Sequence, residues 1–205
     1  MHISFGRKSR LVTLGAGIAA AAAIALSASG PALADTADTG GTATLSVPKA
    51  TVDAWARTNV LLLAGAPATS SFAAGQSSYT LNVTGGNGEV SNFTGILQLG
   101  GGKLVFLNDK TGRTVVVTGV QLNFFNGSIQ GIMPGSTKEM ALAFLSGDMS
   151  TSSNPGPPAT ETFSCDQVVL GATAAKALDT ALNTTGFSRG MSLGGLTTTF
   201  DVTIT

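Results

Sequence analysis

The chain has 205 residues, of which 43% are hydrophobic and 11% are charged, and its formal net charge is zero. Three of the 11 basic residues lie within the first ten positions, whereas every acidic residue follows residue 34. Without residues 1–34 the net charge is −3, so a basic nucleic-acid-binding surface is not expected. The remaining 171 residues suit one domain.

The N-terminus has the order of a secretory signal peptide. A basic start precedes the apolar run 11–26, and Ala32 and Ala34 are the small residues that signal peptidase accepts. The apolar run is short for a membrane span. We therefore expect a signal peptide over residues 1–34 and a flexible leader over residues 35–41. The mature protein should be secreted, extracellular or loosely attached to the cell wall, without a membrane span.

The scarcity of histidine and cysteine excludes several kinds of catalysis. The only histidine is His2, inside the predicted signal, so the mature chain has no imidazole for a Ser-His-Asp or Cys-His site. The only cysteine is Cys165, which excludes an intramolecular disulfide and a zinc site built from Cys and His. We expect Cys165 to be buried, because it shares one face of a predicted strand with Phe163.

Alternation of apolar and polar residues predicts strands along most of the mature chain. Gly119 lies inside the longest of them, residues 113–125, and indicates a bulge. The polar and proline-rich residues 150–160 predict a long surface loop. The predicted strands lie near residues 42–47, 79–83, 93–99, 104–106, 113–125, 129–133, 140–145, 163–170 and 196–204.

Apolar residues recur at helical spacing in two places. Residues 52–63 predict one short amphipathic helix, and residues 173–182 predict a second. About eight strands at hairpin spacing with two short helices favour a mainly β fold, either an antiparallel β-sandwich or a curled barrel. We expect residues 42–205 to form this single β-rich domain.

Few side chains remain that would carry chemistry. Trp55 and Tyr79 are each the only residue of their kind, and we interpret both as core residues, with ligand contact as the alternative. Tyr79 is also the one phenol available to ligate a haem iron. Four acidic residues stand beside predicted turns, and two of them would have to meet in space for a two-carboxylate hydrolase site. They are Glu89, Asp109, Asp148 and Asp166.

Two turns carry side-chain oxygens of the kind that calcium binds. Asn87 and Glu89 lie in one turn and Asn108 and Asp109 in the other, but neither turn has the repeated acidic spacing of a calcium loop. The Asp-Thr-Gly tripeptide at residues 38–40 matches the catalytic motif of aspartic proteases, but it occurs once and precedes the first predicted strand. We predict neither a metal site nor a catalytic residue.

Three segments are the basis of a family resemblance. Residues 82–88 (NVTGGNG) and 95–106 (GILQLGGGKLVF) place a Gly-Gly turn before a strand, a glycine-rich hairpin and another strand. Residues 168–178 (VVLGATAAKAL) precede the last strand with a short helix. Over most of residues 42–205, this order resembles that of exported actinobacterial haem-transport-associated (HtaA-type) domains.

The resemblance implies a β-rich fold with small helices and the capture of haem outside the cell. It also implies an iron-ligating tyrosine in the N-terminal region, helped by a histidine. The sequence departs from both, because residues 55–64 hold no tyrosine and the mature chain holds no histidine. We therefore carry over no ligand residue, and haem follows as a cofactor only from the resemblance.

These observations predict a secreted, non-enzymatic β-sandwich module that binds a partner or ligand at the bacterial cell envelope. The partner would be an envelope or extracellular component rather than a nucleic acid. Extracellular haem capture by a diverged HtaA-type domain is one alternative. A hydrolase with a two-carboxylate site is the other.

Overall fold

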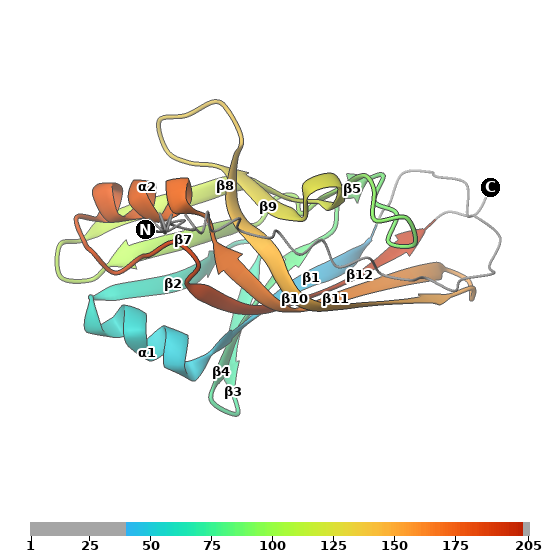
Figure 1. Cartoon of the computed structure of the whole chain (residues 1–205), viewed down its shortest axis with the longest axis horizontal. Helices are drawn as coiled ribbons and strands as arrows, with labels where there is room; N and C mark the ends of the chain where they lie inside the picture. The colour runs from blue at the N-terminus through green and yellow to red at the C-terminus, as the bar shows by residue number, and fades with distance from the viewer. Residues whose placement is uncertain (1–39, 203–205) are drawn as a thin grey trace, which may run out of the picture.

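The computed structural model describes residues 40–202. The predicted signal peptide with Ala32 and Ala34, and all but the end of the predicted leader, lie outside the described residues. The described chain is mainly β, as predicted, with twelve strands, two α-helices and one short 3-10 helix (Figure 1). The elements are β1 Gly41–Pro48, α1 Lys49–Arg57, β2 Val60–Gly65, β3 Thr69–Ala73, β4 Gln76–Asn82, β5 Gly85–Gly86, β6 Ile96–Gln98, β7 Lys103–Asn108, β8 Arg113–Asn123, the 3-10 helix Phe124–Asn126, β9 Ser128–Ile132, β10 Met140–Asn154, β11 Ala159–Leu170, α2 Ala172–Leu182 and β12 Ser192–Val202.

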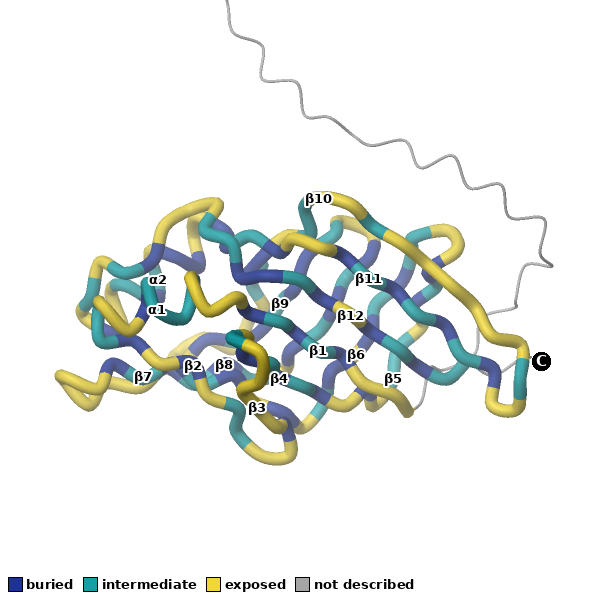
Figure 2. Tube along the Cα trace, turned by 90° about the horizontal axis from the view of Figure 1, so that it is seen from below, coloured by how far each residue is buried: buried dark blue, intermediate teal, exposed yellow. Residues whose placement is uncertain are grey.

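Alternation of side chains sends one face of each central strand into the core. In β1, Ala43, Leu45 and Val47 are buried, and Leu45 lies opposite both Leu196 of β12 and Tyr79 of β4. Figure 2 shows the same alternation as dark blue and lighter segments along β1, β11 and β12. The first and last predicted strands are therefore confirmed over their described residues.

The strands form one antiparallel sheet that curls until its edges approach each other. Its order is β2-β7-β8-β9-β10-β11-β12-β1-β4-β3, while β6 pairs with β8 and carries β5. The edge strand β2 approaches the β3–β4 hairpin, where the Tyr79 hydroxyl donates a hydrogen bond of 3.0 Å to the Leu62 carbonyl of β2. This bond crosses the seam between the two edges. The curled sheet agrees with the predicted class, but twelve strands replace the expected eight.

The predicted helix over residues 52–63 is correct only in its first half. α1 ends at Arg57, and Asn59 follows with a φ of 60°, a left-handed conformation through which a helix does not continue. Residues 60–63 then alternate between buried and exposed, as a strand does. Four apolar residues in a row fit both the helical and the strand period, so the pattern alone does not separate them.

The two helices close one end of the curled sheet (Figure 1). Trp55 of α1 lies near Phe187, with ring centroids 6.1 Å apart, and Phe187 lies 5.8 Å from Phe106 of β7. α2 confirms the second predicted helix. The buried residues of α2 are Ala174, Ala175, Leu178 and Leu182.

The opposite end of the sheet is filled by three phenylalanines. Phe93 lies 5.2 Å from Phe124 and 5.6 Å from Phe163, and the last two rings are 5.4 Å apart. Phe124 and Phe163 are fully buried. Cys165, two residues further along β11, is also buried and free, as predicted. The curled sheet thus has a core that is packed with aromatic rings at both ends.

The predicted surface loop over residues 150–160 is wrong. Residues up to Asn154 belong to β10 and residues from Ala159 belong to β11, so the turn of this long hairpin spans only residues 155–158. Among the described strands, β9 pairs with β10 only over residues 140–144. The far arm of β10, residues 145–154, consists mostly of exposed polar residues. It therefore lacks the apolar alternation that identifies a strand in a sequence.

The longest predicted strand bends at its glycine. The pairing of β8 with β9 shifts register between Thr118 and Gln121, and Gly119 adopts a φ of 56°. The predicted bulge is thus confirmed. The strand itself ends at Asn123, two residues before its predicted end, because the 3-10 helix begins there.

Candidate functional site

Trp55 lies in the core at the helix-capped end. Its side chain is 1% exposed, and its indole Nε1–H donates to the sulfur of Met191 at 3.1 Å. The apolar space beside it measures only about 40 Å³ and is bounded by core side chains such as Leu104 and Leu178. Ligand pockets usually measure about 300–1,000 Å³, so this space does not suit a ligand.

Tyr79 is buried at the seam of the sheet. Its side chain is 5% exposed, and its hydroxyl donates to the Leu62 carbonyl. Burial raises the pKa of the phenol above its ordinary value, and a hydrogen bond with Ser77 opposes the rise. The phenol is therefore held neutral, with its proton directed at a carbonyl, which is the opposite of what a metal-ligating phenolate needs.

Two of the four predicted acidic residues meet in a surface hollow. The backbone N–H of Asp148 donates to Oδ1 of Asp166 at 2.9 Å, and both residues line an open hollow of about 330 Å³. The hollow forms where the β10–β11 and β11–β12 pairings both shift register. Its remaining lining is made of hydroxyl-bearing and small or apolar residues: Ser46, Met149, Ser150, Ser164, Cys165, Gly195, Leu196 and Thr197.

The other two acidic residues lie elsewhere. Glu89 accepts hydrogen bonds from Ser91 and Asn92 in the segment beside the phenylalanine cluster. Asp109 lies in the β7–β8 turn, where its backbone N–H donates to the carbonyl of Asn59. Of the four predicted acidic residues, Asp148 and Asp166 are therefore the two that line the same hollow.

The asparagines of the two predicted oxygen-rich turns have structural roles. Asn87 Oδ1 accepts the N–H of Ile96, and Asn108 Oδ1 accepts the N–H groups of Lys110 and Thr111. Within residues 40–202, no three His, Cys, Asp or Glu side chains gather in a way that would hold a metal ion.

Glu161 is a buried carboxyl group that the sequence motifs do not single out. It is 3% exposed, and its Oε2 accepts the N–H of Val90 at 3.2 Å. Burial raises the pKa of Glu161, the hydrogen bond from Val90 opposes the rise, and the negative charge of Glu89 adds to it. The alternation of β11 could have indicated this burial from the sequence. A strand that turns Phe163 and Cys165 inward also turns Glu161 inward.

Replacing Glu161 with glutamine is expected to stabilise the fold more at neutral pH than in acid. The pKa of this carboxyl group is raised in the fold, so the group does not lower the unfolding free energy at pH values below its ordinary pKa of 4.5. The unfolding free energy falls as the pH rises through the folded pKa, because the buried group then ionises. Glutamine keeps an acceptor for Val90 but does not ionise. The thermal unfolding midpoint of Glu161→Gln, compared with wild type, should therefore rise at about pH 7.5 and not at about pH 4. An equal rise at both pH values would contradict this account.

The curled antiparallel sheet with two helices at one end is similar in fold to a solved HtaA domain. The C-terminal domain of HtaA from Corynebacterium glutamicum matches with a TM-score of 0.56 at 14% sequence identity, over 82% of this chain and 99% of that domain. The heme binding protein HtaB from the same organism matches with a TM-score of 0.49 at 12% identity, over 83% of this chain and 97% of that protein. Neither a protein-family model nor a curated protein matches the sequence. The fold that the resemblance implies is therefore confirmed by the HtaA domain.

The residues do not reproduce the haem ligands that the resemblance implies. Residues 40–202 contain no histidine, and Tyr79, the only tyrosine of the chain, is buried in the seam. A tyrosine–histidine pair at the iron therefore does not fit this chain.

Within residues 40–202, no helix has the length and hydropathy needed to cross a membrane.

Proposed function

We propose that this chain is an exported, non-enzymatic capture module for haem. One observation carries the proposal, namely the match to the HtaA C-terminal domain over 99% of that domain. The signal-like N-terminus supports export. The lack of histidine after residue 34 excludes a Ser-His-Asp or Cys-His catalytic site.

Capture in this chain differs from the mode that the resemblance implies. The buried phenol of Tyr79 stabilises the seam and does not face a ligand. The proposal therefore rests on the fold and assigns no residue of this chain to the iron.

A titration of hemin into the wild type and the Tyr79→Phe variant tests both parts of the proposal. We expect the Soret band to shift in the same way for both proteins, because the phenol faces the seam. The variant should also lose about 1 kcal/mol of unfolding free energy, since one buried hydrogen bond disappears.

The other outcomes of this titration are decisive. No shift with wild-type protein at micromolar hemin would contradict haem capture. A shift that disappears only in Tyr79→Phe would instead assign the phenol to the iron, which would mean that the seam opens.

A further inference from the structure

The outer face of β2, β7 and β8 carries an apolar patch. In the pairing of these strands, Leu61 lies opposite Leu107, and Leu63 lies opposite Val105, which in turn lies opposite Val116. Leu61 and Leu63 are 37% and 42% exposed, and the other three are partly exposed. The inner face of the same strands already fills the core, so this outer patch does not serve the packing of the domain. We call these five residues the outer patch.

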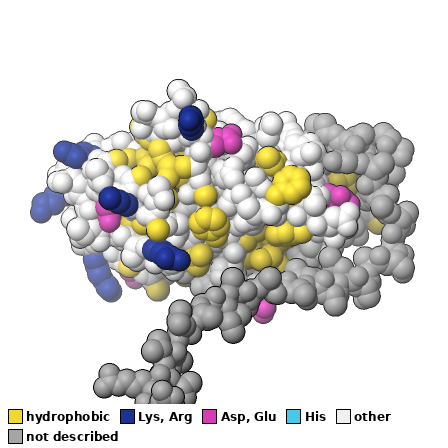
Figure 3. Space-filling view, turned by 45° about the horizontal axis from the view of Figure 1, so that its top comes forward, with side chains coloured by type: hydrophobic (Ala, Val, Ile, Leu, Met, Phe, Trp, Pro, Cys, Tyr) yellow, Lys and Arg dark blue, Asp and Glu magenta, His cyan; other side chains and the backbone are white. Residues whose placement is uncertain are grey.

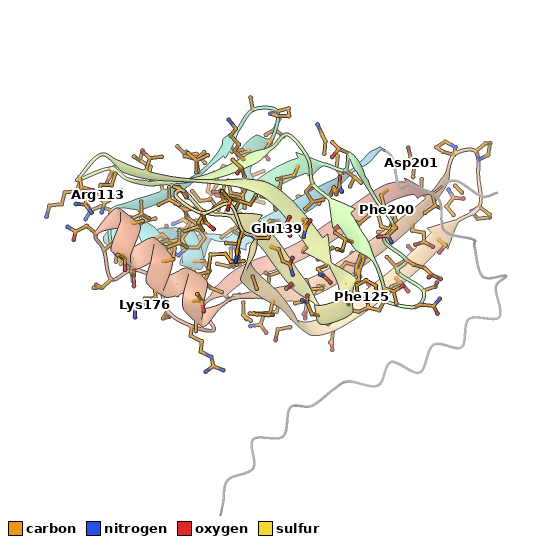
Figure 4. All side chains as sticks on the ribbon, turned by 90° about the horizontal axis from the view of Figure 1, so that it is seen from above. Arg113, Phe125, Glu139, Lys176, Phe200 and Asp201 are labelled. Atoms are coloured by element: carbon orange, nitrogen blue, oxygen red, sulfur yellow. The ribbon has the colours of Figure 1, made fainter. Side chains whose placement is uncertain are left out.

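Exposed basic residues lie at both ends of the outer patch. Lys103 occupies the next position on the same face of β7, two residues before Val105, and it lies opposite Gly65. Lys110 lies in the β7–β8 turn at the other end. Arg113 begins β8 there, opposite the buried Asn108, and Figure 4 shows it at the tip of that hairpin.

A fourth basic residue joins the same end of the patch. Arg57 ends α1, two residues before Asn59, whose carbonyl accepts the N–H of Asp109 in the β7–β8 turn. Asp109 is the one acidic residue in that turn. Among residues 40–202 the one ion pair joins Lys49 and Asp53, so no carboxylate neutralises the four basic residues through an ion pair. On the face that Figure 3 displays, Lys and Arg side chains gather toward the helix-capped end of the molecule.

The shape of the outer patch selects the kind of occupant. It lies on the flat outer face of strands, whereas small ligands require a concave pocket. A stable protein interface involves about 20–30 residues a side, far more than five apolar and four basic residues provide. Association with a membrane surface needs only modest apolar burial together with attraction between basic side chains and anionic headgroups.

Addition of a partner strand at the edge of β2 is also disfavoured. Tyr79 already donates its hydroxyl proton to the carbonyl of Leu62 on that edge. A partner that paired with β2 would have to displace this buried bond. The free surface that remains is the side-chain face of the strands rather than their backbone edge.

We propose that the outer patch and its basic rim dock this domain onto an anionic lipid membrane surface. The aliphatic side chains of the outer patch on β2 and β7 enter the headgroup boundary, and the basic residues around it contact lipid phosphates. The domain would thereby be held close to the membrane without a spanning segment. This function is separate from haem capture and is measured without hemin.

Sedimentation of the purified protein with lipid vesicles tests the proposal. Wild type should bind vesicles that contain phosphatidylglycerol but not vesicles of phosphatidylcholine alone, and high salt should release it. The double variant Lys103→Gln/Lys110→Gln should bind about 30-fold more weakly, since each basic residue at a membrane surface contributes about 1 kcal/mol. The double variant Leu61→Ser/Leu63→Ser should bind about tenfold more weakly or worse.

Matched controls separate this surface from general effects. Phe125→Ser removes a side chain that is 69% exposed but lies on the 3-10 helix, and Lys138→Gln removes a basic residue of the β9–β10 connection. Both should bind vesicles like wild type, and circular dichroism should show that every variant is folded. Equal binding to both kinds of vesicle, or equal losses in the controls, would overturn the proposal. Retention on an acidic protein such as polyglutamate but not on anionic vesicles would also overturn it, in favour of a protein partner.

Discussion

Replacing Phe163 with alanine is expected to lower the free energy of unfolding by about 3–5 kcal/mol. The ring is fully buried on β11 and packs against Phe93 and Phe124, at centroid distances of 5.6 and 5.4 Å. Its removal forfeits the transfer free energy of the ring and leaves a cavity between strands that cannot collapse freely. Chemical denaturation followed by circular dichroism measures the loss.

Phe125 is the matched control for this substitution. It has the same side chain and directly follows Phe124, but it is 69% exposed. Phe125→Ala should change the unfolding free energy by less than about 0.5 kcal/mol. If the two alanine variants lost similar stability, the arrangement of the phenylalanine cluster would be wrong.

Replacing Trp55 with alanine should have an effect of similar size, about 3–5 kcal/mol. The indole is 1% exposed, lies 6.1 Å from the ring of Phe187, and donates its N–H to Met191. These contacts attach α1 to the interior of the sheet. Circular dichroism is again the appropriate probe, because the substitution removes the only tryptophan fluorophore.

The Trp55→Phe variant distinguishes packing from ligand contact. Phenylalanine retains most of the apolar volume, so a smaller loss of stability is expected, while the response to hemin should remain that of wild type. A variant of wild-type stability that no longer responds to hemin would contradict the core position of Trp55.

The sequence was most informative where one face of a strand is buried and the other is exposed to solvent. Such alternation predicted the first and last strands and the inward position of Cys165, and the glycine at residue 119 predicted the bend in β8. It failed where the polarity of the side chains does not alternate. Residues 60–63 are apolar on both faces and the far arm of β10 is polar on both faces, so β2 and the long hairpin were missed.

The candidate sites depend on contacts between residues far apart in the chain. The Tyr79–Leu62 bond exists only because the curled sheet brings its two edges together. The approach of Asp148 to Asp166 depends on two register shifts, which composition does not reveal. Burial of Glu161 was within reach of the alternation, but its partner Val90 lies 71 residues away.

The stoichiometry of hemin binding to the wild-type protein tests the proposed function most directly. Hemin is added in increments to a fixed micromolar concentration of protein, and both the Soret band and the fluorescence of the single tryptophan are followed. The account predicts that both signals saturate at one hemin per chain. A response that rises without saturation, or no response in either signal, would contradict haem capture.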